Sequence, residues 1–208
     1  MKILTFLTLI SLFGGLMACT NDDTPNPVPE PVSEKVVNLH APQEGGQGEP
    51  ISGAFTKFNF ADKQITTSET EWDIAFRGTT IIVNGGVSAG AVDEPERTGN
   101  AAAYIAEGTL AGIDAVETER LVQDNASGYA IPAGSGNGWY SYASAPTHLI
   151  SPIPGRVLVF RTHDGKYAKV EILSYYKDAP DNPDAFVNED SYYTFNYVYQ
   201  PKEDITTF

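Results

Sequence analysis

Short runs of alternating apolar and polar residues recur along the chain, separated by clusters of Gly, Pro, Asn and Asp. A period of two places successive side chains on opposite faces of a β-strand. In the segment 72–77, this period predicts a strand with Trp72, Ile74 and Phe76 on one face. Further short strands are predicted over residues 36–40, 58–60 and 79–83, each of which ends near Gly, Pro or Asp.

The clearest local pattern lies near the C-terminus, where apolar segments 157–163 and 166–173 flank Asp164-Gly165. Asp-Gly between two such segments favours a hairpin with a two-residue type I′ turn. His163 would then lie exposed at the hairpin tip. A last strand is predicted over 192–199, with four aromatic side chains on one face that should help to close the core: Tyr193, Phe195, Tyr197 and Tyr199.

The middle of the chain, residues 84–138, is rich in Ala and lacks long alternating runs. It is expected to be loop-rich, with one or two strands around 108–123. A short helix over 101–107 is an open alternative, limited by Gly108. No internal repeat is visible, so residues 35–208 are expected to form a single, all-β, antiparallel domain.

The N-terminus is typical of an export signal. Lys2 precedes an apolar run over 3–16 that is too short to span a membrane. The following Leu16-Met17-Ala18-Cys19 resembles a bacterial lipobox, which implies that residues 1–18 are removed as a lipoprotein signal peptide. Cys19 would then carry a diacylglycerol. The alternative is an ordinary secretory signal followed by a chance cysteine.

After Cys19, the segment up to residue 34 is interpreted as a spacer. It has acidic residues at its start and prolines at every second position from 25 to 31, a composition that favours an extended chain. Acidic residues directly after a lipidated cysteine also resemble the surface-export signals of Bacteroidetes lipoproteins. The expected location is the outer membrane, through the lipid anchor alone and exposed at the cell surface.

Composition narrows the classes of function. Lys and Arg total 13 and Asp and Glu total 27, a net charge of −14 that argues against nucleic-acid binding. The single cysteine excludes a disulfide framework and a multi-cysteine metal site. The sequence contains no histidine pair with zinc spacing, no phosphate-binding loop and no Gly-x-Ser-x-Gly motif. A binding protein is therefore expected rather than an enzyme.

Three histidines are present: His40, His148 and His163. His148 lies on a connection that follows Trp139, Tyr140 and Tyr142 and contains a proline. A histidine in such a place can face a pocket or can be an ordinary loop residue, and the residues themselves leave both open. His40 closes the first predicted strand, where a structural or exposed role is expected.

Several motifs together resemble those of the HmuY-like haem-binding lipoproteins of Bacteroidetes. They occur in order over nearly the whole predicted domain: Asn-Leu-His-Ala-Pro-Gln at 38–43, Trp-Asp-Ile-Ala-Phe-Arg and its continuation at 72–86, Gly-Asn-Gly-Trp-Tyr at 136–140, and the segments 165–176 and 192–201. The resemblance implies an all-β fold and haem capture, with transfer to a TonB-dependent outer-membrane receptor. The alternative is a surface lipoprotein that binds a glycan or a peptide, without haem.

The resemblance also guides the choice of iron ligands. Ser144 stands where a family histidine is expected and His148 follows four residues later, so His148 is the inherited candidate with a shift. Residues 84–138 contain no histidine, and both methionines, at 1 and 17, precede Cys19. Bis-histidine or methionine ligation from the equivalent loops is therefore excluded.

The second axial position of the iron would be occupied by a phenolate or by water, or would have no ligand. The candidate phenolates are Tyr129, Tyr140 and Tyr142, and His40 is a further candidate if the fold brings it close. Trp139, Tyr140 and Tyr142 would pack on the porphyrin or, alternatively, belong to the core. Three arginines are available for the haem propionates: Arg77, Arg156 and Arg161.

Overall fold

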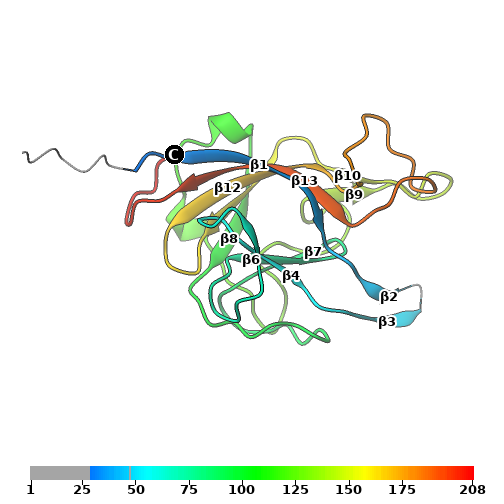
Figure 1. Ribbon diagram of the computed structural model, residues 1–208, viewed down its shortest axis with the longest axis horizontal. Coiled ribbons are helices and arrows are strands. Elements are labelled where there is room, and N and C mark those ends of the chain that lie inside the picture. Colours follow the sequence, from blue (N-terminus) through cyan, green and yellow to red (C-terminus); the bar gives the residue numbers. More distant parts are fainter. Residues whose placement is uncertain (1–28, 47) are drawn as a thin grey trace, which may run out of the picture.

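The computed structural model describes residues 29–46 and 48–208 and contains two antiparallel sheets that pack face to face (Figure 1). The larger sheet has the order β1 (Val32–His40), β13 (Tyr192–Gln200), β12 (Tyr167–Ser174), β11 (Arg156–Arg161) and β8 (Ala102–Glu107). The smaller sheet has the order β5 (Gln64–Thr66), β4 (Thr56–Asn59), β6 (Ile74–Arg77) and β7 (Thr80–Val83). Two short hairpins complete the fold: β2 (Glu44–Gly46) with β3 (Glu49–Ser52), and β9 (Tyr140–Tyr142) with β10 (Ile150–Pro152). The predicted all-β antiparallel fold is confirmed.

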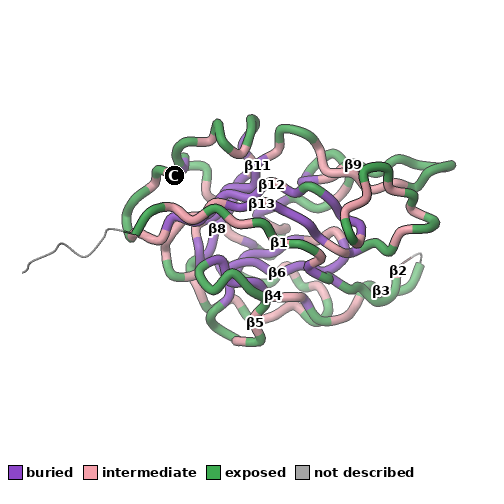
Figure 2. The backbone as a smooth tube through the Cα atoms, turned by 45° about the horizontal axis from the view of Figure 1, so that its top comes forward, coloured by how far each residue is buried: buried purple, intermediate pink, exposed green. Residues whose placement is uncertain are grey.

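Aromatic side chains fill the space between the two sheets. Tyr193, Phe195 and Tyr197 alternate along β13 and are buried on its inner face. The ring of Phe76 lies 4.7 Å from that of Tyr193, and the ring of Phe58 lies 5.7 Å from that of Phe195. These contacts join the two sheets in one continuous core, which appears as the buried interior in Figure 2. The predicted aromatic face of the last strand is therefore confirmed.

The outer face of each sheet is also covered. On the larger sheet, Tyr104, Val157 and Val159 pack beneath the segment 110–121 and Phe208. On the smaller sheet, Ala75 and Ile82 pack with Trp72, Phe55 and Tyr129. The expectation that Trp72 shares a face with Ile74 and Phe76 is wrong, because β6 begins only at Ile74 and the chain before it does not keep the strand period. Trp72 lies on the opposite, outer side of this sheet.

Residues 84–138 are loop-rich, as expected, but they contain a six-residue strand, β8, where a helix was an alternative. Ala103 points into the core between the sheets, and Tyr104 points to the outer cluster. This alternation, together with pairing along the free edge of β11, outweighs the helix propensity of alanine. The strands expected around 108–123 are absent from the described structure, which has two 3₁₀ turns there instead: η1 (Leu110–Gly112) and η2 (Thr118–Arg120).

A buried ionic network holds the long 84–130 connection against the smaller sheet. The Arg97 guanidinium lies 3.0 Å from carboxylate oxygens of both Glu94 and Asp124, and all three side chains are almost fully buried. Asp124 also accepts hydrogen bonds from the backbone N–H groups of Val83 and Ala130. Because each buried charge has several partners, this network can order a segment that has little regular structure of its own.

The hairpin between β11 and β12 is confirmed, but its turn is not type I′. Gly165 N donates to the Thr162 carbonyl at 3.1 Å, and Thr162 N donates to the Lys166 carbonyl at 2.8 Å. Gly165 has a φ of 91°, whereas His163 and Asp164 keep negative φ values. A type I′ turn needs positive φ at both central residues, so this is a three-residue loop with glycine in the left-handed position.

The prediction that His163 is exposed at the hairpin tip is wrong. Its backbone N–H and its Nδ1 both contact the same Asp73 oxygen, at 2.9 and 2.7 Å. The Asp73 side chain is buried, and its other oxygen accepts a hydrogen bond from Phe60 N. The pair therefore ties the hairpin of the larger sheet to the beginning of β6.

Strand β1 begins at Val32, three residues before the expected start of the domain at residue 35. Val32, Ser33 and Glu34 pair with Tyr199, Val198 and Tyr197 along the edge of β13, so the end of the expected spacer is part of the sheet. The predicted signal peptide 1–18, Cys19 and the predicted spacer up to residue 28 lie outside the described residues. Within residues 29–46 and 48–208, no helix has the length and apolar character needed to cross a membrane.

Replacing Phe195 should destabilise the protein more than replacing an exposed strand residue. Phe195→Ala leaves a cavity against Phe58, Phe76 and Tyr197, which should lower the free energy of unfolding by about 3–5 kcal/mol in urea denaturation. Val37, which is 56% exposed on β1, provides the control. Val37→Ala should change the same quantity by no more than about 0.5 kcal/mol. Equal losses in the two variants would contradict the assignment of the aromatic interface as the core.

The His163–Asp73 pair should make stability depend on pH. The hydrogen bond to Asp73 raises the pKa of His163 above its usual 6.5, although partial burial opposes this change. A raised folded-state pKa means that the stabilisation is complete below about pH 6.5 and is lost as the pH rises through the folded value. Each unit of the rise corresponds to about 1.4 kcal/mol in the free energy of unfolding. His163→Gln should remove this dependence in urea denaturation at several pH values, whereas His40→Gln should retain it.

Candidate functional site

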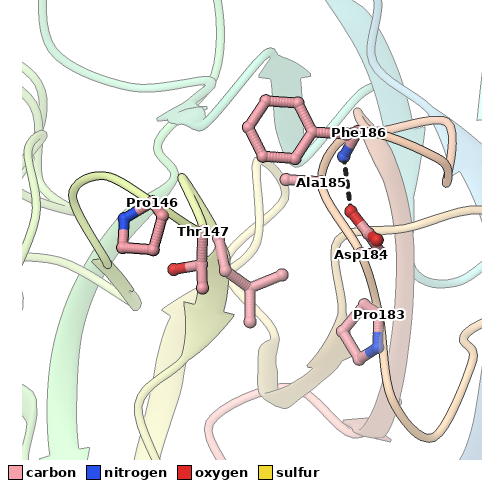
Figure 3. A pocket seen from close by; sticks show the side chains of 7 residues that line it. Pro146, Thr147, Pro183, Asp184, Ala185 and Phe186 are labelled. Carbon is pink, nitrogen blue, oxygen red and sulfur yellow. Dashed lines mark hydrogen bonds between the residues drawn. The ribbon is translucent and has the colours of Figure 1, made fainter.

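Two loops at one end of the sandwich enclose an open cleft of about 370 Å³ (Figure 3). One loop, residues 143–149, joins β9 to β10, and the other, residues 177–190, precedes β13. The volume lies in the range of small-molecule pockets. Five of the seven lining residues are apolar, and the other two are Thr147 and Asp184. The apolar residues are Pro146, Leu149, Pro183, Ala185 and Phe186.

Backbone hydrogen bonds give each loop its shape. In the first loop, Ala143 N donates to the Leu149 carbonyl at 2.8 Å, and His148 N donates to the Ser144 carbonyl at 3.3 Å. His148 has a φ of 50°, an uncommon value for a non-glycine residue, and it is exposed. Ser144 and His148 therefore belong to one tight turn, although they are four residues apart in sequence.

The second loop is closed at its base and turned at its tip by separate contacts. Lys177 N donates to the Glu189 carbonyl at 2.9 Å, and the side chains of these two residues form an ion pair. At the tip, an Asp184 carboxylate oxygen accepts a hydrogen bond from Phe186 N at 2.9 Å (Figure 3). The phenyl ring of Phe186 is 72% exposed. Together with Val187, which is 77% exposed, Phe186 leaves a small apolar surface uncovered at the loop tip.

His148 lies between two lining residues, Thr147 and Leu149, and its imidazole contacts β9 and the second loop. Its Nδ1 is hydrogen bonded to the Tyr142 hydroxyl, and its ring meets that of Phe186 edge to face at 5.8 Å. The part of the chain that the structure describes offers Nε2 no hydrogen-bond partner. A hydroxyl can accept a hydrogen bond from Nδ1–H as well as donate one to an unprotonated Nδ1, so Tyr142 can hold the tautomer whose Nε2 lone pair is free.

The structure thus brings together two of the six candidate ligand and stacking residues, His148 and Tyr142. Tyr140 is next to them on β9, and its hydroxyl accepts a hydrogen bond from the Thr79 hydroxyl at 3.3 Å. Tyr140 and Tyr142 line a second, neighbouring cleft rather than the first. Trp139 belongs to the core: it is 3% exposed, and its indole N–H donates to the Thr79 carbonyl at 2.9 Å.

The remaining two candidates lie in other surroundings. The Tyr129 hydroxyl donates to Glu94 at 2.6 Å, and its ring packs near Trp72 on the outer side of the smaller sheet. Burial and the hydrogen bond to Glu94 raise the pKa of Tyr129, which opposes a phenolate at this position. His40 is exposed at the end of β1 and stacks on Tyr192, with ring centres 4.2 Å apart.

The three arginines considered for the propionates are all engaged with backbone carbonyls. Arg77 is buried and donates to Gly53 and Val92. Arg156 donates to the carbonyls of residues 136 and 138, and Arg161 donates to that of residue 100. Among the described residues that line the two clefts, none is basic, and Asp184 and Asp190 contribute negative charge.

Phe186 and its neighbours Pro183 and Ala185 were not identified from the sequence as site residues. One pattern could have indicated them. Phe186-Val187 is an isolated apolar pair within a stretch of prolines and acidic residues, and such a pair has no strand partner to cover it. Both side chains are more than 70% exposed.

The chain is similar to several solved structures. A structure described as the apo HmuY analogue of Tannerella forsythia aligns with 85% of this chain and 100% of its own, with a TM-score of 0.52 at 14% identity. A candidate lipoprotein of Bacteroides fragilis aligns with 83% of this chain and 90% of its own (TM-score 0.43, 16% identity). A candidate HmuY-like haem-binding protein of Bacteroides vulgatus aligns with 83% of this chain and 93% of its own (TM-score 0.43, 13% identity).

Among curated proteins, none matches the chain. The first of the three structures supports the fold alone, because its sequence identity is low. The family model is more specific, since it is built from sequence patterns and covers more than half of the chain. The model described as HmuY protein matches residues 53–197. This chain therefore belongs to the HmuY family.

Proposed function

We propose that this chain is a non-enzymatic haem-binding protein that holds the iron through His148. The observation that carries the proposal is the arrangement of this residue: Nδ1 is engaged by Tyr142, Nε2 is free among the described residues, and the ring stands between two loops. Membership of the HmuY family supports the same ligand class.

The chemistry of the residues present fits the iron and the macrocycle. A neutral imidazole nitrogen is a common axial ligand of haem iron. A hydrogen bond to the other ring nitrogen fixes the orientation and the tautomer of the ligand, which is the role proposed for Tyr142. Pro146, Leu149 and Phe186 provide apolar surface against which a porphyrin can pack. Bound haem would supply redox-active iron, and the protein would supply its orientation.

One protein ligand is proposed rather than two. The described structure brings no second histidine to the cleft, since His40 stacks on Tyr192 and His163 is bonded to Asp73. The second axial position is assigned to water or left open. Because the described lining residues include no cation, the propionates are expected to face solvent, where water can hydrate them.

Cell-surface capture and transfer of haem are proposed as the biological role. In this proposal, Cys19 carries the lipid anchor in the outer membrane, and a TonB-dependent receptor accepts the haem. A ligand bound by one axial residue in an open cleft can be released more readily than one held on both sides. The exposed loop that carries Phe186 and Val187 would be accessible to such a receptor.

Titration with ferric haem, followed by absorbance, tests the ligand. The mature chain should bind haem with a shifted Soret band, and His148→Ala should change that spectrum and weaken binding. Tyr142→Phe should retain the histidine-ligated spectrum with about tenfold weaker binding, because it removes only the hydrogen bond that orients the imidazole. His40→Ala is the matched control and should behave as the wild type.

Each result of this titration has a distinct meaning. An unchanged spectrum for His148→Ala would remove His148 from the site. A changed spectrum for His40→Ala would reassign the ligand to that histidine. Absence of binding by the wild type would exclude the haem proposal as a whole.

Replacement of the proposed lipidation site should change the location of the protein. In cells grown with an alkyne-tagged fatty acid, the wild-type protein should carry the label and sediment with the membranes, because several acyl chains give stable anchoring. Cys19→Ser should carry no label and should leave the outer-membrane fraction. Labelling of the Cys19→Ser protein would contradict the assignment.

A further inference from the structure

A second cleft of about 480 Å³ lies beside the first and has a different chemical character. Five segments that are far apart in sequence converge on it: the start of the β2 hairpin, the turn between β6 and β7, the β9–β10 hairpin with the loop before it, the chain after β12, and the chain before β13. Its lining consists mainly of aromatic and uncharged polar residues: Gln43, Gly45, Gly78, Thr79, Ser135, Tyr140, Tyr142, Ile150, Tyr175, Asp190 and Ser191.

The walls of this cleft are fixed by buried contacts. Ala41, which is fully buried, donates from its N–H to the Ser191 carbonyl at 2.7 Å and accepts from Gly78 N at 2.8 Å. The Tyr193 hydroxyl donates to the Gly78 carbonyl at 2.8 Å. The three segments that contain these residues are therefore held together before a ligand arrives, which lowers the entropic cost of binding.

Gly78 allows one wall to lie unusually close to another. Its φ is 49°, and a Cβ atom at this position would lie 2.4 Å from the Gln43 side-chain oxygen. The absence of a side chain lets the Gln43 amide rest directly on the turn, facing the cleft. The described residues offer the polar atoms of this amide no hydrogen-bond partner, so both a donor and an acceptor are available to a ligand.

The segment before β13 presents a carboxylate to this cleft, at the end of a hydrogen-bonded chain. The Tyr175 hydroxyl lies 2.9 Å from the Ser191 hydroxyl, and the Ser191 hydroxyl donates to one Asp190 oxygen at 3.0 Å. The other Asp190 oxygen is left to accept a hydrogen bond from a ligand. Tyr142, which is 43% exposed, adds an accessible aromatic ring between this cleft and the first one.

These features favour a particular class of ligand. A carboxylate with no basic residue among the described lining repels phosphates, sulfates and carboxylates. Several uncharged donors and acceptors beside an exposed tyrosine ring suit a molecule that has many hydroxyl groups and one apolar face. A pyranose ring has both properties, since its C–H groups lie on the faces and its hydroxyls lie around the edge.

We propose that the second cleft is a binding site for neutral carbohydrate that lies beside the haem site and shares Tyr142 with it. A sugar ring stacks on Tyr142, and its hydroxyls are bound by Asp190 and by the amide of Gln43. Ligand recognition depends on the uncharged state of the sugar, so sialylated and sulfated glycans are rejected. The site gives the protein an affinity for glycosylated surfaces that does not require haem.

Binding to a glycan array, followed by calorimetric titration with the best neutral oligosaccharide, tests this site. The mature chain, with Cys19→Ser to prevent lipidation, should bind neutral glycans and leave sialylated and sulfated ones unbound. Asp190→Asn and Gln43→Ala should each weaken binding by about tenfold or more, because each removes a hydrogen bond to the sugar. Asp184→Asn, which changes the acidic residue of the first cleft, is the matched control and should bind as the wild type.

The same variants separate this proposal from the haem proposal. Asp190→Asn and Gln43→Ala should bind haem as the wild type does, and Phe186→Ala, which changes only the first cleft, should bind the oligosaccharide as the wild type does. Absence of binding to every neutral glycan would overturn the proposal, as would binding confined to anionic glycans or to amines. Wild-type affinity in both Asp190→Asn and Gln43→Ala would place any glycan site elsewhere.

Discussion

The aromatic interface between the two sheets is the constraint on which the other features depend. Phe195 contacts the rings of both Phe58 and Phe76, so one residue of β13 spans two strands of the facing sheet. Next to it, Tyr193 both packs on Phe76 and donates from its hydroxyl to the carbonyl of Gly78. The same interface therefore supplies apolar burial and sets the position of the turn that forms one wall of the second cleft.

A few polar contacts connect this interface to the strand and loops of the proposed binding site. The Trp139 indole donates to Thr79, and the next residues of the chain form β9, which carries Tyr140 and Tyr142. Loops that are anchored in this way can present exposed side chains in fixed positions, because the rigid scaffold limits their conformational freedom. His148 and Phe186 come from the two loops of the first cleft, and their rings meet edge to face.

Strand periodicity was sufficient to predict the fold class, the aromatic face of β13 and the hairpin of β11 with β12, because these depend on local alternation. It was insufficient where contacts between residues distant in sequence determine the position of a side chain. His163 is next to a turn in sequence, but a buried carboxylate ninety residues away in the chain binds it. Trp72 lies just before a strand and therefore does not follow its period. Similarly, the hydrogen bond between Tyr142 and His148 depends on how the loop between β9 and β10 bends. The contact of Phe186 with His148 depends on a second loop, and no local sequence pattern indicates the path of that loop.

The β9–β10 hairpin has a consequence for how this protein can evolve. It pairs through three residues on each strand and belongs to neither sheet of the sandwich, so few backbone hydrogen bonds of the two main sheets run through it. Residues 143–148 of its connecting loop are exposed, so substitutions there meet solvent and selection for stability constrains them weakly. Such a division lets the residues of this loop diverge while the scaffold persists. Affinity for a new ligand can therefore arise by a small number of substitutions in this loop, each of which leaves the scaffold folded.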